Sequence, residues 1–137
     1  MGVKPTPAKN EIRGNLRDLD IEIGFLEGVV RRDGRYIDAL RLLGDDYTRR
    51  GRVNEGLKVD RRLARLCPDD PLIQYNLACS LSLVGRCRDS VKALKQAFSL
   101  GYRDIKWLRK DPDLKEARKH PAFVEIEEAI KQFPAAE

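Results

Sequence analysis

Two stretches of the chain decide its fold: LRLLGDDYTRRGRVNEGL at residues 40–57 and QYNLACSLSLVGRCRDSV at residues 74–91. The second begins 34 positions after the first, and at that offset Gly51 aligns with Gly85 and apolar residues largely align with apolar residues. In each stretch, apolar side chains recur every three or four residues on either side of the shared glycine, which predicts two helices joined by a turn. A pattern that returns at a fixed spacing is typical of repeat proteins, whose units bury their apolar faces by stacking.

Residues beside these stretches indicate where the helices end. Gly51 interrupts the first unit, and Gly101 is expected to close a later helix in left-handed backbone. Between the units, Asp70 can accept hydrogen bonds from free amides at a helix start, and Pro71 suits the first helical position. We therefore expect helices to end before each glycine and a new helix to begin at Pro71.

Small residues occupy matching places in the two units. Gly44 and Ala78 lie on the first helix of each unit, and Gly56 and Ser90 lie on the second. Glycine inside a helix costs about 1 kcal/mol relative to alanine. Close approach of the two helices is the expected compensation, so these positions predict where the helices of each unit cross.

A long amphipathic helix is expected before the two units. Between residues 10 and 32, apolar side chains follow one another in alternating steps of four and three, at Ile12, Leu16, Leu19, Ile23, Leu26 and Val30. This spacing places them all on one side of a helix. Residues 1–9 contain two prolines and no such spacing, so a loose tail is expected there.

Three short helices are expected after the second unit. The last two each begin with a proline behind a capping residue, at Asp111-Pro112 and His120-Pro121. Their apolar residues would cover the open end of the stack: Trp107, Leu108, Leu114, Phe123, Ile126 and Ile130. The chain then divides into a partial repeat at 10–36, units at 37–70 and 71–104, and a closing piece at 105–137, forming a single all-α domain over 10–137.

Composition limits the classes of function. The chain has 137 residues, 42% of them hydrophobic, which is enough for one domain with a core. No apolar run is long enough to cross a membrane, and no secretory signal is apparent. Three cysteines without paired spacing and a single histidine argue against a metal site or a disulfide framework. We therefore expect a cytoplasmic protein with no membrane contact, metal or cofactor.

The two units resemble the tetratricopeptide repeat family. The resemblance rests on Leu40-x-x-Leu43-Gly44-x-x-Tyr47-x-x-x-Gly51 with Glu55-Gly56-Leu57, and on Tyr75-Asn76-Leu77-Ala78-x-x-Leu81-x-x-x-Gly85 with Asp89-Ser90-Val91. The segment that follows resembles the closing piece of many bacterial arrays of this family. The resemblance implies an α-solenoid of seven to eight helices in antiparallel pairs, with a concave groove that binds another protein or a peptide.

In that implied geometry, the first helix of each unit and the closing piece line the groove. The residues expected there are Arg41, Asp45, Thr48, Arg49, Leu72, Tyr75, Asn76, Cys79, Ser82, Lys106 and Lys110. Some members of the family hold a peptide's terminal carboxylate at places occupied here by Arg41, Asp45, Asn76, Lys106 and Lys110. Asp45 would bring a like charge to that carboxylate, which counts against such a clamp.

Catalysis is not indicated. The chain contains no Gly-rich phosphate loop, no supported Ser-His-Asp set and no His-Glu-x-x-His pattern. His120 precedes a proline and is most simply a residue at the start of a helix. The sequence therefore predicts a protein-binding scaffold or adaptor rather than an enzyme.

Two alternatives remain open. Residues 31–66 carry 11 basic and 6 acidic side chains, the whole net excess of +5. A nucleic acid could contact their arginines, at Arg49, Arg50, Arg52, Arg61, Arg62 and Arg65, although no aromatic residues alternate with them. Alternatively, the helix at 10–32 lacks a partner helix, exposes Ile21 and Phe25, and docks on another copy to form a homodimer.

Overall fold

The computed structural model describes the backbone of residues 9–134 and the side chains of residues 16–134. Residues 1–8 of the predicted loose tail lie outside the described residues, and the side chain of Ile12 is not among those that the structure describes. Across the described residues the chain forms helices and no strand, which confirms the all-α prediction. The elements are α1 (Lys9–Arg32), α2 (Ile37–Arg49), α3 (Val53–Leu66), α4 (Pro71–Leu83), α5 (Cys87–Ser99), α6 (Ile105–Leu108), the 3-10 helix η1 (Pro112–Leu114), α7 (Lys115–Lys119), the 3-10 helix η2 (Pro121–Phe123) and α8 (Val124–Lys131).

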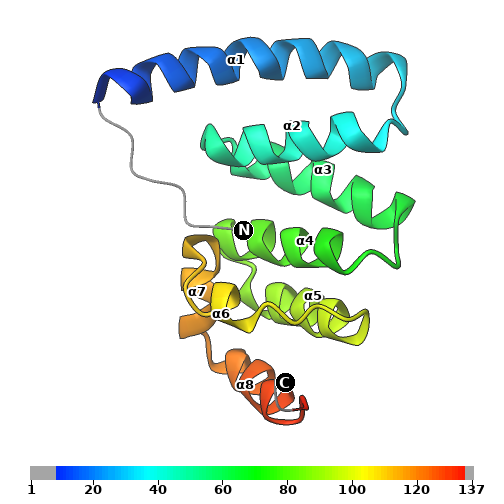
Figure 1. Ribbon diagram of the computed structural model, residues 1–137, viewed down its shortest axis with the longest axis vertical. Helices are drawn as coiled ribbons and strands as arrows, with labels where there is room; N and C mark the ends of the chain where they lie inside the picture. Colours follow the sequence, from blue (N-terminus) through cyan, green and yellow to red (C-terminus); the bar gives the residue numbers. More distant parts are fainter. Residues whose placement is uncertain (1–8, 135–137) are drawn as a thin grey trace.

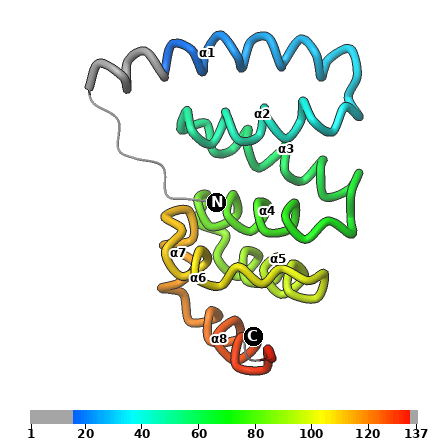
Figure 2. The backbone as a smooth tube through the Cα atoms, in the orientation of Figure 1, coloured from blue at the N-terminus to red at the C-terminus, as the bar shows by residue number. Residues whose placement is uncertain are grey.

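Each helix from α1 to α4 packs against the one that follows it. Figure 1 shows them in succession from α1 at one end of the molecule toward α8 at the other. The closest associations are α2 with α3 and α4 with α5, while η1, α7 and α8 lie against α4 or α5. The backbone trace in Figure 2 follows the same course, running back and forth from helix to helix.

Three helices end in the same way. Gly51, Gly85 and Gly101 have φ angles of 86°, 84° and 111°, in the left-handed region that a side chain disfavours. After each glycine, the next amide donates back to the helix, with N to O distances of 2.8, 2.8 and 2.9 Å, at Arg52 to Tyr47, Arg86 to Leu81 and Tyr102 to Ala97. These bonds satisfy carbonyls that a helix end otherwise leaves free.

The small residues lie where the paired helices cross. A Cβ added to Gly56 would lie 2.8 Å from Thr48 Oγ1 and 3.5 Å from the carbonyl oxygen of Gly44. In the next pair, the fully buried Ser90 donates a 2.7 Å hydrogen bond to the carbonyl oxygen of Ala78. Both crossings therefore depend on residues that leave space for a neighbouring backbone.

The closing piece covers α4 and α5 as expected. Leu108, Leu114 and Ile126 are fully buried in the largest core cluster, together with Phe123, and the half-buried Trp107 and Ile130 pack against it. The prolines behave as predicted too. Asp111 accepts the amide of Asp113 at 3.0 Å, and His120 Nδ1 accepts the amide of Ala122 at 3.1 Å, so that each caps its 3-10 helix.

Candidate functional site

A pocket of about 610 Å³ opens between α2, α3, α4 and the segment that joins α6 to η1. It brings together eight of the predicted groove residues, namely Arg41, Asp45, Thr48, Arg49, Tyr75, Asn76, Cys79 and Lys110. Arg41 and Asp45 on α2 occupy the same places as Tyr75 and Cys79 on α4, 34 positions later. Corresponding faces of two helices thus line a single pocket.

Three other predicted groove residues do not line this pocket. Leu72 is exposed at the start of α4, and Lys106 is exposed on α6. Ser82 is 1% exposed, and its hydroxyl accepts a 3.1 Å hydrogen bond from the amide of Ala117 on α7. The closing piece therefore covers the end of α4 that the sequence pattern had left open.

The floor of the pocket contains a buried hydrogen-bonded cluster. The Tyr75 hydroxyl donates to Asp111 Oδ2 at 2.6 Å, and the Cys79 thiol approaches the same oxygen at 3.6 Å. The sequence indicated Asp111 only as a residue that caps a helix. The spacing of Tyr75 and Cys79 places both side chains on one face of α4, but Asp111 lies 36 positions after Tyr75, so no local pattern indicated it as their partner.

Two further carboxyls line the pocket and were missed as site residues. Asp60 on α3 is buried and accepts a hydrogen bond from the Ser80 hydroxyl. Burial raises the pKa of Asp60 to about 7, with the Asp45 carboxylate adding to the shift and the Ser80 bond opposing it. Burial likewise raises the pKa of Asp113 to about 6, helped by the carboxylates of Asp111 and Asp45. The pocket is therefore poorly supplied with positive charge near its carboxyls.

The positively charged side chains that line the pocket lie in more exposed positions than its buried carboxyls. Arg41 forms a 3.1 Å ion pair with Asp70, outside the pocket lining, and its side chain is 40% exposed. Arg49 lies 4.0 Å from Asp45, and its side chain is 45% exposed. Lys110 is also exposed. A positive ligand group could therefore approach the buried carboxyls, whereas a peptide carboxylate would meet like charge.

The apolar walls complete the pocket. Leu63, Trp107 and Pro112 line it beside Tyr75, and the ring of Tyr75 is stacked on that of Tyr102, with centroids 4.3 Å apart. Such rings offer flat apolar surface and can attract a cation to their faces. The arrangement can hold an amphipathic side chain with a positive end.

One group of donor atoms in the pocket invites a metal interpretation. The side chains of Cys79, Asp111 and Asp113 offer one ligand atom each within 4.8 Å of one another. Burial raises the pKa of the Cys79 thiol well above 9.0, with nearby Asp111 adding to the shift. Since thiols bind metals as thiolates and Asp111 already accepts three hydrogen bonds, this donor set fits a metal poorly.

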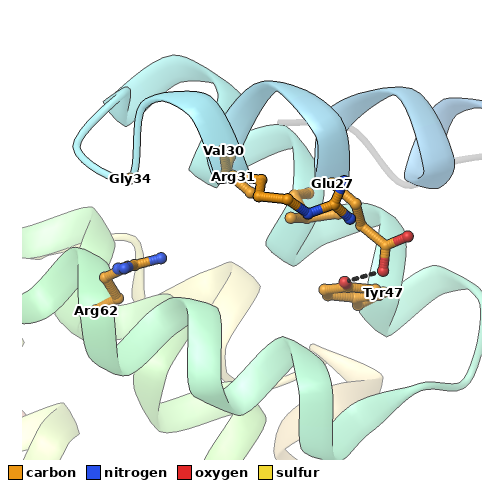
Figure 3. A pocket seen from close by; sticks show the side chains of 7 residues that line it. Glu27, Val30, Arg31, Gly34, Tyr47 and Arg62 are labelled. Atoms are coloured by element: carbon orange, nitrogen blue, oxygen red, sulfur yellow. Dashed lines mark hydrogen bonds between the residues drawn. The ribbon is translucent and has the colours of Figure 1, made fainter.

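A second pocket, of about 560 Å³, lies beneath α1. Figure 3 shows Glu27 and Arg31 on α1, Tyr47 on α2 and Arg62 on α3 around it. Tyr47 donates a 2.6 Å hydrogen bond to Glu27, and burial is the main cause of the raised pKa of that tyrosine. This contact attaches α1 to α2 and leaves the two arginines beside open space.

The arginine cluster is partly neutralised within the chain. Arg50 lies 2.8 Å from Asp20 on α1, and Arg52 lies 2.7 Å from Glu55. Arg49 lies 3.9 Å from Asp46 as well as near Asp45. Half of the six arginines therefore already face carboxylates, which weakens the case for a continuous phosphate-binding surface.

In the part of the chain that the structure describes, no helix combines the length and apolar character needed to span a bilayer. No protein-family model matches the chain. A curated chloroplastic protein of Arabidopsis thaliana is similar to it, being 30% identical over 93 residues. The match covers 66% of this chain and 27% of that protein, so the chain spans little more than a quarter of the relative's length. The chloroplast location belongs to the relative, and a cytoplasmic location for this chain stays a prediction.

Proposed function

We propose that this chain is a non-catalytic protein-binding module built from two stacked tetratricopeptide-like helix pairs, preceded by one helix and ended by a closing piece. Repeated geometry supports the proposal. The turns at Gly51 and Gly85 have nearly equal φ angles and equal 2.8 Å closing bonds, and the crossing at Gly44 and Gly56 recurs 34 positions later at Ala78 and Ser90. Equal local structure at equal spacing is what stacked repeats require.

The observation that carries the binding function is the 610 Å³ pocket between corresponding faces of α2 and α4. A binding surface on a helical repeat lies across successive units, so that one ligand touches several of them. Arg41 and Tyr75, and likewise Asp45 and Cys79, supply such matched contacts here. An extended or helical segment of another protein fits this arrangement.

The partner segment presents a lysine or arginine side chain to the pocket. The carboxyls of Asp60, Asp111 and Asp113 line the pocket. Burial disfavours the charged form of Asp60 and of Asp113 and so raises the pKa of each. A cation beside them would offset that cost and favour ionisation. Binding should therefore strengthen as pH rises through about 6 to about 7, where these two groups ionise.

Selection from a displayed library of random peptides on the full chain tests this proposal. Enriched peptides are expected to carry lysine or arginine beside an apolar residue, and to change the fluorescence of Trp107, the single tryptophan, which lines the pocket. Replacing the peptide's lysine with norleucine should weaken binding about tenfold or more, since charge-assisted hydrogen bonds contribute about 1.5–3 kcal/mol.

Matched variants of the protein locate the contact. Asp113→Asn should weaken binding of the selected peptide, whereas Asp69→Asn removes the same charge from an exposed position outside the pocket and should not. The binding proposal fails if selected peptides leave Trp107 unaffected and ignore both substitutions. Enrichment of acidic peptides that bind in this pocket would keep the groove but overturn its preference for a cation.

A further inference from the structure

The outer face of α1 has no partner among the described residues. Figure 1 shows α1 at the end of the stack, with the rest of the molecule on one side of it. Leu19, Ile23 and Leu26 are buried, and the latter two belong to the core cluster shared with α2. Asp20 also forms a 2.8 Å ion pair with Arg50 at the end of α2. The opposite face is therefore held toward the outside.

That outer face carries two exposed apolar side chains and two glycines, and each glycine leaves a hollow on the helix surface. Ile21 is 65% exposed and Phe25 is 70% exposed. At Gly24 and Gly28, an added Cβ would meet nothing within 4 Å. Positions 21, 24, 25 and 28 share one face of a helix, so large side chains alternate there with places that have none.

Opposite charges flank these residues on the same face. Asp18 lies about one turn before Ile21, and Arg32 lies about one turn after Gly28; both are exposed. An antiparallel copy of the helix, related by a two-fold axis between Gly24 and Phe25, would bring Asp18 opposite Arg31 of the second copy and within one residue, about 1.5 Å along the helix, of its Arg32. The same operation would place Ile21 over the second copy's Gly28, and Phe25 over its Gly24.

We propose that α1 docks antiparallel on α1 of a second copy of this chain. The face is complementary to itself in shape and in charge, which is the condition that a two-fold interface imposes. Close contact through glycine lets the two helix backbones approach each other while the exposed Ile21 and Phe25 leave water. The interface is independent of the pocket between α2 and α4 and goes beyond the proposed binding function.

Sedimentation equilibrium of the full chain, from micromolar to millimolar concentration, tests the proposal. A reversible monomer–dimer equilibrium is expected, and Phe25→Glu should weaken it by about tenfold or more, because it places a charge in an apolar contact. Leu42→Glu is the matched control, since Leu42 is an exposed leucine on α2, at 51%, and should leave the dimer intact. A strict monomer at millimolar concentration overturns the proposal, as does equal weakening by both variants.

A second variant separates docking from folding. Gly28→Leu fills the hollow opposite Ile21 and improves helix propensity, so thermal stability of the monomer should rise while the dimer weakens. Tighter association of Gly28→Leu would show general stickiness of the face and would overturn the proposed fit. Asp18→Arg and Arg32→Asp should each weaken the dimer and together restore it; failure of that restoration would refute the antiparallel arrangement.

Discussion

The hydroxyl of Tyr75 on α4 donates a 2.6 Å hydrogen bond to the carboxylate of Asp111, 36 positions later at the start of η1. Both residues are buried, at 2% and 4% exposure. The bond joins the second helix pair to the closing piece and forms part of the pocket at the same time. Loss of this hydrogen bond should therefore both destabilise the fold and disturb the lining of the pocket.

Tyr75→Phe should lower the free energy of unfolding by about 1–3 kcal/mol, because it leaves a buried carboxylate oxygen without its strongest partner. Urea unfolding followed by circular dichroism measures the loss. Tyr36→Phe removes the same hydroxyl from a side chain that is 48% exposed and should cost much less. Equal effects of the two variants would show that the Tyr75 bond contributes nothing.

Asp60 predicts how stability changes with pH. Its pKa is about 7 in the folded protein, against an ordinary value of 3.8. Between those values the folded state holds a proton that the unfolded state releases, so the free energy of unfolding falls as pH rises. Asp60→Asn should reduce this fall between pH of about 5 and about 8 by more than about 1 kcal/mol. Urea unfolding of both variants across that pH range measures the effect, with Asp69→Asn as the exposed control. Equal slopes of the free energy of unfolding against pH in Asp60→Asn and Asp69→Asn would show that Asp60 does not cause the pH dependence.

Replacement of glycine by alanine should have opposite effects on stability at Gly28 and at Gly44. At Gly44, an added Cβ would lie 3.0 Å from Asp60 Oδ1 and 3.2 Å from Val59 Cγ1, whereas at Gly28 it would meet nothing within 4 Å. Gly28→Ala should therefore stabilise the monomer by up to about 1 kcal/mol through helix propensity. Gly44→Ala should be destabilising by about 1–3 kcal/mol, because it overpacks a crossing where Asp60 is buried and held by its hydrogen bond from Ser80. Thermal unfolding at one low protein concentration compares them, and stabilisation by both would disprove the close crossing.

Arg118 should hold the closing piece together. Its Nη1 donates to the carbonyl oxygens of Leu108 at 2.9 Å and Asp111 at 2.7 Å. Arg118→Met keeps much of the apolar stem but leaves both carbonyls without this donor. Amide hydrogen exchange should accelerate in α6 and η1 and change little in α2 and α3. Lys119→Met, at an exposed neighbouring position, is the control and should leave exchange in α6 unchanged.

The local pattern predicted most of the helices because each signal acts over a few residues. The spacing of apolar side chains indicated α1 to α5, and the glycines at 51, 85 and 101 marked the ends of three of them. Proline after a capping residue likewise indicated where η1 and η2 begin. These features depend on backbone geometry and short-range hydrogen bonds, which the chain specifies directly.

The candidate site could be predicted only in part for the same reason. The resemblance to the tetratricopeptide repeat family implied the face of α4 that contains Tyr75, Asn76 and Cys79, and these three residues do line the pocket. It could not show that the closing piece folds back over Ser82. Nor could it show that Asp60 approaches Ser80 across a helix contact.

By itself, the sequence determined which residues form helices, where several of those helices end and which small residues allow them to cross. Only the tertiary structure decided that Asp60, Asp111 and Asp113 meet in one pocket, since they come from separate elements. The physical reason is that burial and charge are collective properties. A carboxyl acquires a raised pKa from the neighbours that packing brings to it, and no spacing along the chain records those neighbours.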